Sequence, residues 1–558
     1  MLLPGLDSLP LIDRDEPRFA HATVEMMYRS EWVIPYFNDE YRFDKPPLTY
    51  WWMRVHFWIF GINEFASRLH SAVASLLCAL LIFGFARRLG CDNLRAFLAG
   101  AGWLTCLQVL IHSRMAVADL PLILFLILTM RALWELLNRD PARPFSRCFS
   151  DPWFYTLGVS MGLGFLAKGP LAQSVPLLAI LLWGGLNRCR KRPSPNFVRL
   201  LLYFLASAPL WLGLMAAWGI PALLATRGAF YDVGIGRHVV ERGTSAFNDR
   251  FFLPGVFYLV AVLPFLLPWS PRLPDVFKTG WKDDGQSGSF LLAWFLSPFL
   301  IFSFYASQLP HYILPGYPAI FLLLFLTETP HTSRWFGKSI AVICVALPAG
   351  AVLFFLFCSA FIPGGEDITA LRPLLHLAAL AAVLMAVASW CALKRKFFGV
   401  LTASVLGAFL VIPISRAARN VHITIRLHEK LKDDCFDMRM AWRFTEPSLV
   451  WYFDDREDFK WQFPPNPYPK PAAPNRILVL EHRRWRIDGK TFRAVLRRQK
   501  TIPPTKSYRE TPEFQETVAA FKQGTSKWRE VTAIGWSPAT STWIEVVAIV
   551  PESLPASE

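Results

Sequence analysis

The sequence has few charged residues: Asp, Glu, Lys and Arg make up 18% of its 558 residues, whereas soluble domains carry about 25%. This shortage of surface-forming side chains excludes an ordinary soluble enzyme, a disordered tail and a coiled coil. Hydrophobic residues make up 53% and aromatic residues 15%, and several segments stay apolar for the roughly 20 residues that a bilayer crossing needs. The composition therefore predicts a polytopic membrane protein.

Familiar soluble-enzyme motifs are also missing. The sequence contains no Walker A loop, no GxGxxG turn and no HExxH motif. Its nine cysteines show no spacing typical of a zinc site or of a disulfide framework, and its N-terminus lacks the features of a signal peptide. These absences leave nucleotide chemistry, a cysteine-held zinc and a disulfide scaffold without support.

The basic residues lie mainly in short loops. The formal net charge is +16, which in a soluble protein would suggest nucleic-acid binding. Here the basic loops alternate with loops that are acidic, mixed or very short, as the positive-inside rule predicts, so the basic set is cytoplasmic. The remaining polar segments then share the extracytoplasmic side: residues 1–66, the Arg114–Asp119 turn, Lys168, loop 220–250, the Gln308–Tyr312 turn and the C-terminal domain.

The chain divides into three regions. Residues 1–66 are charged and aromatic and predict an extracytoplasmic loop that carries an acidic motif. Residues 67–416 predict a transmembrane helical domain, and residues 417–558 a small extracytoplasmic α/β domain. The predicted fold class is a polytopic α-helical membrane protein with about 12–13 transmembrane helices. We also expect a helix ahead of residue 1 to lead the first loop across the membrane; the alternative is direct insertion with the N-terminus outside.

Hydrophobic periodicity and turn signals place the elements. Helices are predicted near 67–86, 96–112, 116–137, 152–167, 170–186, 198–219, 252–270, 289–306, 311–328, 339–361, 372–393 and 397–415. In the polar tail, strands are predicted at Ser448–Phe453, Arg476–Glu481 and Trp543–Val550. A further helix is predicted to begin at Thr511–Pro512, with Thr as its N-cap.

The first candidate site is an acidic and basic run. Asp13, Arg14, Asp15, Glu16 and Arg18 lie within six residues. A carboxylate beside a guanidinium stays ionised, so it can accept a proton or stabilise positive charge. The alternative is a solvated loop with local ion pairs.

Two lysines predict phosphate contacts. Lys45 precedes two prolines, which present its cation on a stiff turn next to aromatic residues suited to the membrane interface. Lys168 separates two apolar helices at the outer face. A charge within or at the end of a membrane helix is energetically costly, so it points to a function. The alternatives are that Lys45 anchors the chain to lipid headgroups and that Lys168 snorkels to them.

Two further turns complete the set. Arg114 and Asp119 stand before an apolar helix, where helix capping alone would also explain the Asp. His311 and Tyr312 lie in a proline-rich turn, and a lone His is more often structural than catalytic. Together these turns predict an outward-facing pocket with carboxylates for acid–base chemistry and cations for a lipid phosphate.

Six sequence motifs follow one another along the chain. They are Asp-Arg-Asp-Glu-x-Arg-Phe-Ala (13–20), Ser-Glu-Trp-Val-Ile-Pro-Tyr-Phe-Asn (30–38), Asp-Lys-Pro-Pro-Leu (44–48), Arg-x4-Asp-x-Pro-Leu (114–122), Leu-x-Lys-Gly-Pro (166–170) and Leu-Pro-x-Tyr-Ile-Leu-Pro-x-Tyr-Pro (309–318). In this order they resemble the motifs of bacterial GT-C glycosyltransferases, and most closely those of the lipid A 4-amino-4-deoxy-L-arabinose transferases within the protein O-mannosyltransferase-like superfamily. The similarity covers nearly the whole chain.

The resemblance implies a polyprenyl (undecaprenyl) phosphate sugar as donor, a cell-envelope acceptor such as lipid A, and a place in the bacterial inner membrane with the active site facing the periplasm. It also assigns roles. Asp15 and Asp119 match the catalytic acidic positions, whereas the matched substrate-binding positions are Glu16, Arg18, Lys45, Arg114, Lys168, His311 and Tyr312.

The sequence departs from the family at two places, and both affect the cofactor prediction. Asp44 stands where relatives often have Glu, and Asn248 and Asp249 stand where relatives carry a His. A divalent metal therefore remains open, without a predicted ligand set. The other functions left open are a protein O-mannosyltransferase-like enzyme, a transporter or flippase of lipid-linked sugars, and a sensor or scaffold.

Overall fold

The computed structural model describes most of the chain. The described residues are 2–194, 196–231, 256–283, 285–305, 308–327, 334–359, 372–432, 434, 438–453, 461–462, 476–487, 504–522 and 527–552. Most of the predicted loop 220–250 lies outside them, including Asn248 and Asp249.

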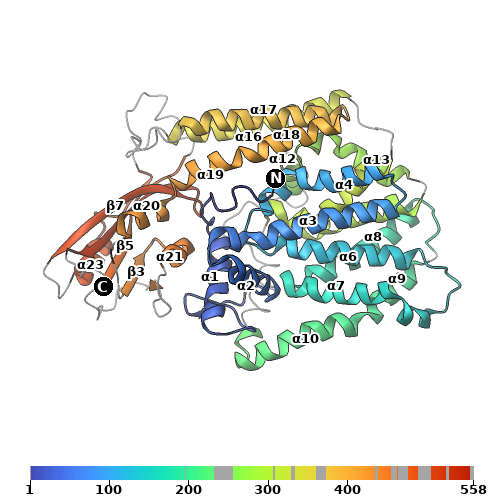
Figure 1. Ribbon diagram of the computed structural model, residues 1–558, viewed down its shortest axis with the longest axis horizontal. Coiled ribbons are helices and arrows are strands. Elements are labelled where there is room, and N and C mark those ends of the chain that lie inside the picture. The colour runs from blue at the N-terminus through green and yellow to red at the C-terminus, as the bar shows by residue number, and fades with distance from the viewer. Residues whose placement is uncertain are drawn as a thin grey trace.

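Long apolar helices run side by side in one bundle (Figure 1). Six helical segments in the described part are long and apolar enough to cross a membrane: Glu64–Arg88, Asp119–Leu137, Phe197–Ala225, Gln286–Ser303, His376–Leu393 and Phe397–Arg419. The protein is thus a multi-pass membrane protein, as predicted, while the count of 12–13 crossings stays a prediction.

The bundle consists of the following elements: α3 (Glu64–Arg88), α4 (Asn93–Thr105), α5 (Leu107–His112), α6 (Asp119–Leu137), η1 (Phe145–Ser150), α7 (Pro152–Lys168), α8 (Leu171–Cys189), α9 (Phe197–Ala206), α10 (Ala208–Ala225), α12 (Val256–Phe265), η3 (Ser270–Arg272), α13 (Leu273–Lys282), α14 (Gln286–Ser303), η4 (Pro310–Gly316), α15 (Tyr317–Leu326), α16 (Arg334–Ser359), α17 (Arg372–Leu393), α18 (Phe397–Phe409) and α19 (Val411–Arg419). Each predicted helix range is confirmed by helix over most of its length.

Some predicted helices are divided. The segment predicted at 96–112 breaks at Cys106, which has an extended backbone (φ −71°, ψ 130°). The next amide, Leu107 N–H, donates to the Leu267 carbonyl at 2.8 Å instead of bonding within a helix. A tertiary hydrogen bond thus replaces the local one, and hydrophobic periodicity carries no sign of it.

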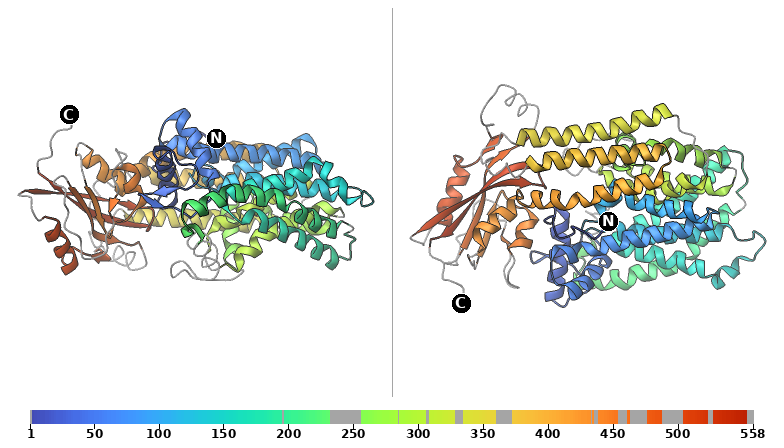
Figure 2. Two further views of the ribbon diagram at one scale, coloured as in Figure 1. Left: turned by 90° about the horizontal axis from the view of Figure 1, so that it is seen from below. Right: turned by 45° about the horizontal axis from the view of Figure 1, so that its top comes forward.

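The first 60 residues form a cap at one end of the bundle. It contains α1 (Asp15–Tyr28), the short strands β1 (Tyr36–Phe37) and β2 (Glu40–Tyr41), and α2 (Leu48–Phe60). Both views in Figure 2 and the view in Figure 1 place α1 and α2 between the bundle and the C-terminal domain. The resemblance implies juxtamembrane helices in this segment.

The C-terminal domain is a mixed sheet with helices. It contains α20 (Ile423–Leu431), β3 (Met438–Trp442), α21 (Pro447–Tyr452), β4 (Trp461–Gln462), β5 (Arg476–Trp485), β6 (Lys506–Ser507), α23 (Pro512–Phe521), β7 (Trp528–Ser537) and β8 (Thr542–Pro551). The strand order is β4-β3-β5-β8-β7, with β6 against β5. The β3–β4 and β3–β5 pairs are parallel, and β8 is antiparallel to both neighbours.

The sequence predictions for this domain hold in part. The strands predicted at Arg476–Glu481 and Trp543–Val550 are confirmed, and Thr511 caps α23 by accepting the Phe514 N–H. The strand predicted at Ser448–Phe453 is wrong, because Pro447 begins the helix α21 there. Proline is favoured in the first helical turn, where no backbone N–H is needed, and that signal outweighs the strand-like composition.

A buried ion pair fixes the cap to the bundle. The Arg68 guanidinium on α3 makes two hydrogen bonds of 2.8 Å to the Glu16 carboxylate on α1 and donates to the carbonyls of Leu6, Leu9 and Pro10. Glu16 also accepts the backbone N–H of Ala116 at 2.7 Å. Since both side chains are almost fully buried, this pair joins the first loop, α3 and the turn before α6.

Candidate functional site

A cavity of about 490 Å³ opens where the cap meets the bundle. Five of the nine predicted site residues line it, from four different segments: Lys45, Asp119, Lys168, His311 and Tyr312. Aromatic and aliphatic side chains such as Phe165 and Trp218 form much of the remaining wall. The cavity therefore combines two cations and two carboxylates, Asp44 and Asp119, with an apolar lining.

Asp119 and Lys168 form an ion pair in this cavity. Asp119 occupies the first position of α6 and Lys168 the last position of α7, and the Lys168 Nζ lies 2.5 Å from an Asp119 carboxylate oxygen. The cap residue of α6 is Ala118, and the Asp119 side chain makes no capping hydrogen bond. Helix capping therefore does not explain the presence of Asp119. Lys168 binds the Asp119 carboxylate inside the protein, which snorkelling to the lipid headgroups would not produce.

Gly169 lets α7 end at Lys168. Its φ of +99° lies in the region that L side chains rarely adopt. The glycine therefore turns the chain sharply after Lys168, and α8 begins two residues later at Leu171.

Lys45 reaches the cavity from the cap. Its Nζ lies 3.1 Å from the Asp44 carboxylate, whose other oxygen lies 3.4 Å from the Arg42 guanidinium. Arg42 also donates to the Tyr50 hydroxyl at 3.1 Å, and the burial of that hydroxyl raises the pKa of Tyr50. The Asp44 carboxylate thus holds both cations at the turn before α2.

Asp15 and Arg18 lie beside this group rather than in the cavity wall. Asp15 is exposed in the first turn of α1 and interacts electrostatically with Arg18 and Arg42. Burial, with Arg42 nearby, lowers the pKa of Arg18. The carboxylate of Asp15 is therefore accessible from outside and stands next to an arginine that contacts Asp44.

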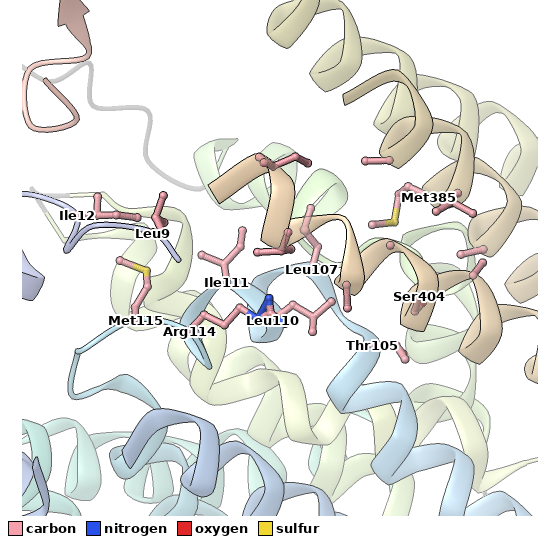
Figure 3. Close-up of a pocket in the computed structure, with 18 residues that line it drawn as sticks. Leu9, Ile12, Thr105, Leu107, Leu110, Ile111, Arg114, Met115, Met385 and Ser404 are labelled. Atoms are coloured by element: carbon pink, nitrogen blue, oxygen red, sulfur yellow. The ribbon is translucent and has the colours of Figure 1, made fainter. Parts of the chain in front are cut away.

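Two predicted residues lie elsewhere. Glu16 is fully buried in its pair with Arg68 and does not line the cavity. Arg114 lines a second, mostly apolar cavity of about 360 Å³ together with Met385 and Ser404 (Figure 3). The structure does not bring either residue to Lys45 and Lys168, so their predicted substrate contacts stay predictions.

The sequence analysis missed His112. It ends α5, and its ring lies 4.9 Å from the His311 ring, centroid to centroid. The sequence did hold one sign of His112: a titratable residue ends an apolar segment shortly before Arg114 and Asp119. The sequence around His112 could not show that η4 brings His311 next to it.

These side chains suit chemistry on a lipid phosphate. Cations placed where negative charge develops stabilise a leaving group, and an accessible carboxylate can orient or deprotonate an acceptor. The apolar walls suit a hydrocarbon chain.

The architecture defines a class: the protein has the fold of the GT-C glycosyltransferases. Its structure is similar to the crystal structure of ArnT from Cupriavidus metallidurans bound to undecaprenyl phosphate, with a TM-score of 0.66 and 18% identity over 98% of this chain and 95% of that chain. The apo structure of the same protein matches with a TM-score of 0.62. The predicted fold class is therefore confirmed.

Sequence comparison names the relatives. The chain is 33% identical over 328 residues to the undecaprenyl phosphate-alpha-4-amino-4-deoxy-L-arabinose arabinosyl transferase of Erwinia tasmaniensis, covering 58% of this chain and 56% of that protein. It is 31% identical over 360 residues to the enzyme of the same name in Aeromonas salmonicida, covering 62% and 63%. A family model described as dolichyl-phosphate-mannose-protein mannosyltransferase matches residues 14–222.

These similarities confirm the resemblance seen in the motifs. The matched regions span less than two thirds of the length of these relatives. The family match covers α1, both cavity lysines and Asp119.

Proposed function

We propose that the protein is a membrane glycosyltransferase that moves a sugar from a polyprenyl-phosphate donor to a cell-envelope acceptor. The observation that carries the proposal is the cavity that joins Lys45, Lys168 and Asp119 to an apolar wall at the cap end of the bundle. The names of the relatives, arabinosyl transferases that use an undecaprenyl phosphate sugar, support the same reaction.

In this proposal the donor's prenyl chain lies along the apolar wall and its phosphate beside Lys45 and Lys168. As the bond between sugar and phosphate breaks, the two ammonium groups stabilise the growing negative charge. Tyr312 and His311 lie in the same cavity and would contact the phosphate or the sugar. No soluble nucleotide is required, since the donor brings its own activated leaving group.

Asp15 would act on the acceptor side. If the acceptor is a hydroxyl, the exposed carboxylate would accept its proton beside Arg18 and Arg42. If the acceptor is a phosphate, as on lipid A, no strong base is needed, and Asp15 would orient the sugar or its amine.

We place the reaction on the periplasmic face of the bacterial inner membrane. The basic loops predict the cytoplasmic side, and the cavity lies at the opposite end of the helices that carry them. The proposed sugar is aminoarabinose, after the names of the relatives, and the proposed acceptor is lipid A, after the motif resemblance. A protein hydroxyl is the second candidate acceptor, favoured by the mannosyltransferase family match.

Mass spectrometry of envelope lipids tests the proposal. Cells that produce the wild-type protein should contain a glycosylated envelope lipid that is absent from cells without the gene and from cells with Asp15→Asn. A glycosylated protein in place of the lipid would favour the second acceptor. Flipped donor lipid without any glycosylated product would contradict both and favour a transporter.

A further inference from the structure

Three side chains with metal-binding atoms converge beside the cavity, and two of them line it. His112 comes from α5, Asp119 from α6 and His311 from η4, and one ligand atom of each lies within 4.8 Å of the other two. In a tetrahedral zinc site the ligands stand about 2.0–2.1 Å from the ion. Small side-chain rotations would therefore bring these three atoms around one ion.

The surroundings of His112 hold its ring in a suitable orientation. Its Nδ1 lies 3.2 Å from the backbone carbonyl of Gln108 and 2.9 Å from the Gln108 side-chain amide nitrogen. If Nδ1 carries the proton and donates it to the carbonyl, Nε2 presents a lone pair. A carbonyl that fixes the tautomer in this way is the usual partner of a metal-bound histidine.

Gln108 supports the same tautomer. Its buried side-chain oxygen has no hydrogen-bond partner among the described residues. The oxygen and nitrogen of a glutamine amide are assigned from their partners, not from their positions. If the amide is turned over, its oxygen lies at the position of the nitrogen and accepts from the Nδ1–H, so the oxygen gains a partner and the amide nitrogen takes the unpartnered position.

The carboxylate and the open position complete the site. Lys168 contacts the Oδ1 oxygen of Asp119, which leaves the second carboxylate oxygen to serve as a ligand. Asp119 and His311 line the cavity, whereas His112 is buried behind it. A bound ion would therefore have three protein ligands and a fourth position facing the cavity, as in catalytic zinc sites.

We propose that His112, Asp119 and His311 bind one divalent transition-metal ion, with zinc favoured by the two imidazoles and one carboxylate. The Lys168 ammonium opposes a second positive charge nearby, and an anionic phosphate in the cavity offsets that repulsion. Zinc and a lipid phosphate should therefore strengthen each other's binding by the same factor. This coupling rests on the proposed function; the metal site itself does not.

Metal analysis of the purified full-length protein tests the site. After chelator treatment, equilibration with Zn²⁺ and gel filtration in detergent, the wild type should retain about one zinc ion more than His112→Gln and His311→Gln. The matched control is His376→Gln, since His376 is an exposed histidine on α17 and should leave the zinc content unchanged. Gln108→Ala should weaken zinc binding roughly 10–100-fold, as expected for a residue that orients the metal ligand His112 through a hydrogen bond.

A second measurement avoids dependence on the variants. Co²⁺ added to the wild type should give the visible absorption bands of tetrahedral nitrogen and oxygen ligands, and Zn²⁺ should remove them. Equal zinc retention by the wild type and both histidine variants would overturn the site, as would a folded wild type that gives no cobalt bands. Zinc binding without sugar transfer would instead contradict the proposed function and leave the site standing.

Discussion

Three carboxylates close together in the sequence have three different environments. Asp13 is buried against the C-terminal domain, Asp15 is exposed, and Glu16 is paired with Arg68 in the interior. The acidic run therefore performs at least two structural tasks, and only Asp15 presents an accessible oxygen.

Replacing Asp15 should affect chemistry without affecting folding. In Asp15→Asn we expect sugar transfer to fall roughly 10²-fold or more, because a positioned proton acceptor contributes that much, while the unfolding temperature stays at the wild-type value. Transfer by the purified protein and thermal unfolding in detergent measure the two effects. Wild-type turnover by this variant would remove Asp15 from the mechanism.

The Asp119–Lys168 pair allows structure and binding to be separated. Lys168→Met leaves a buried carboxylate unpaired and should destabilise the protein by about 3–5 kcal/mol. The double variant Asp119→Asn with Lys168→Met should recover most of that stability but not the affinity for undecaprenyl phosphate. Thermal unfolding and lipid-binding titrations provide the comparison, and full recovery of affinity would show that Lys168 acts on Asp119 alone.

Five polar residues singled out in the sequence share one cavity, while their catalytic and binding roles stay predictions. Lys45, Asp119, Lys168, His311 and Tyr312 were recognised because each is an unusual polar group in a turn between apolar segments, and they do meet in one cavity. By contrast, the partners of Glu16 and Arg114 are tertiary, and tertiary partners leave no local pattern.

At the scale of elements, α1 is held by its buried pair with α3. The Glu16–Arg68 pair satisfies the guanidinium with one carboxylate and three carbonyls and also binds the amide of Ala116. It thereby connects α1 to the turn that leads to Asp119, so the pair has a structural role.

Removing one partner of that pair should unfold the cap. Arg68→Ala leaves Glu16 buried without its partner and should cost about 3–5 kcal/mol, detectable as a lower unfolding temperature and as faster proteolysis within residues 2–60. The matched control is Arg95→Ala, since Arg95 pairs with the largely exposed Asp92 and should change stability by less than about 1 kcal/mol. Equal stability of the two variants would contradict this role.

Helix positions were largely predictable, whereas helix interruptions were not. A run of apolar residues marks each long helix, but the break at Cys106 depends on the Leu267 carbonyl. The amphipathic helix α13 (Leu273–Lys282) was overlooked because it is too short and too polar to resemble a membrane crossing. The strand predicted at Ser448–Phe453 was wrong because its strand-like composition was given more weight than Pro447, which begins a helix.

At the scale of the whole molecule, the cap and the C-terminal domain meet through a buried acidic contact. The Asp13 carboxylate accepts the Ser448 N–H at 2.8 Å and the Ser448 hydroxyl at 2.6 Å. His422 lies 3.9 Å away, and burial lowers its pKa to about 3, which leaves it neutral. Burial, with Glu446 nearby, raises the pKa of Asp13 from 3.8 to about 8.

This contact should make stability depend on pH. The unfolded carboxyl loses its proton near 3.8 and the folded one near 8, so between these values the folded state binds more protons. The contribution of Asp13 is complete below the lower value and is lost as the pH rises through the upper one. Thermal unfolding at a series of pH values should show this loss, and Asp13→Asn should flatten it.

Asp15→Asn serves as the control for that measurement, since Asp15 is exposed and should leave the wild-type pH dependence intact. Identical slopes for the wild type and Asp13→Asn across the same range would contradict the assignment to Asp13.

The Asp13–Ser448 contact joins residues 435 positions apart. During translation the acidic loop emerges long before the ribosome reaches its partner, and β8, the strand between β5 and β7, is made later still. The growing polypeptide must therefore insert its helices while the loop beside the cavity still lacks its final anchor. Completion of the domain outside the bilayer would then be the last step of maturation, so a nascent chain arrested before Ser448 carries all six apolar helices found in the described residues but an unsecured cap.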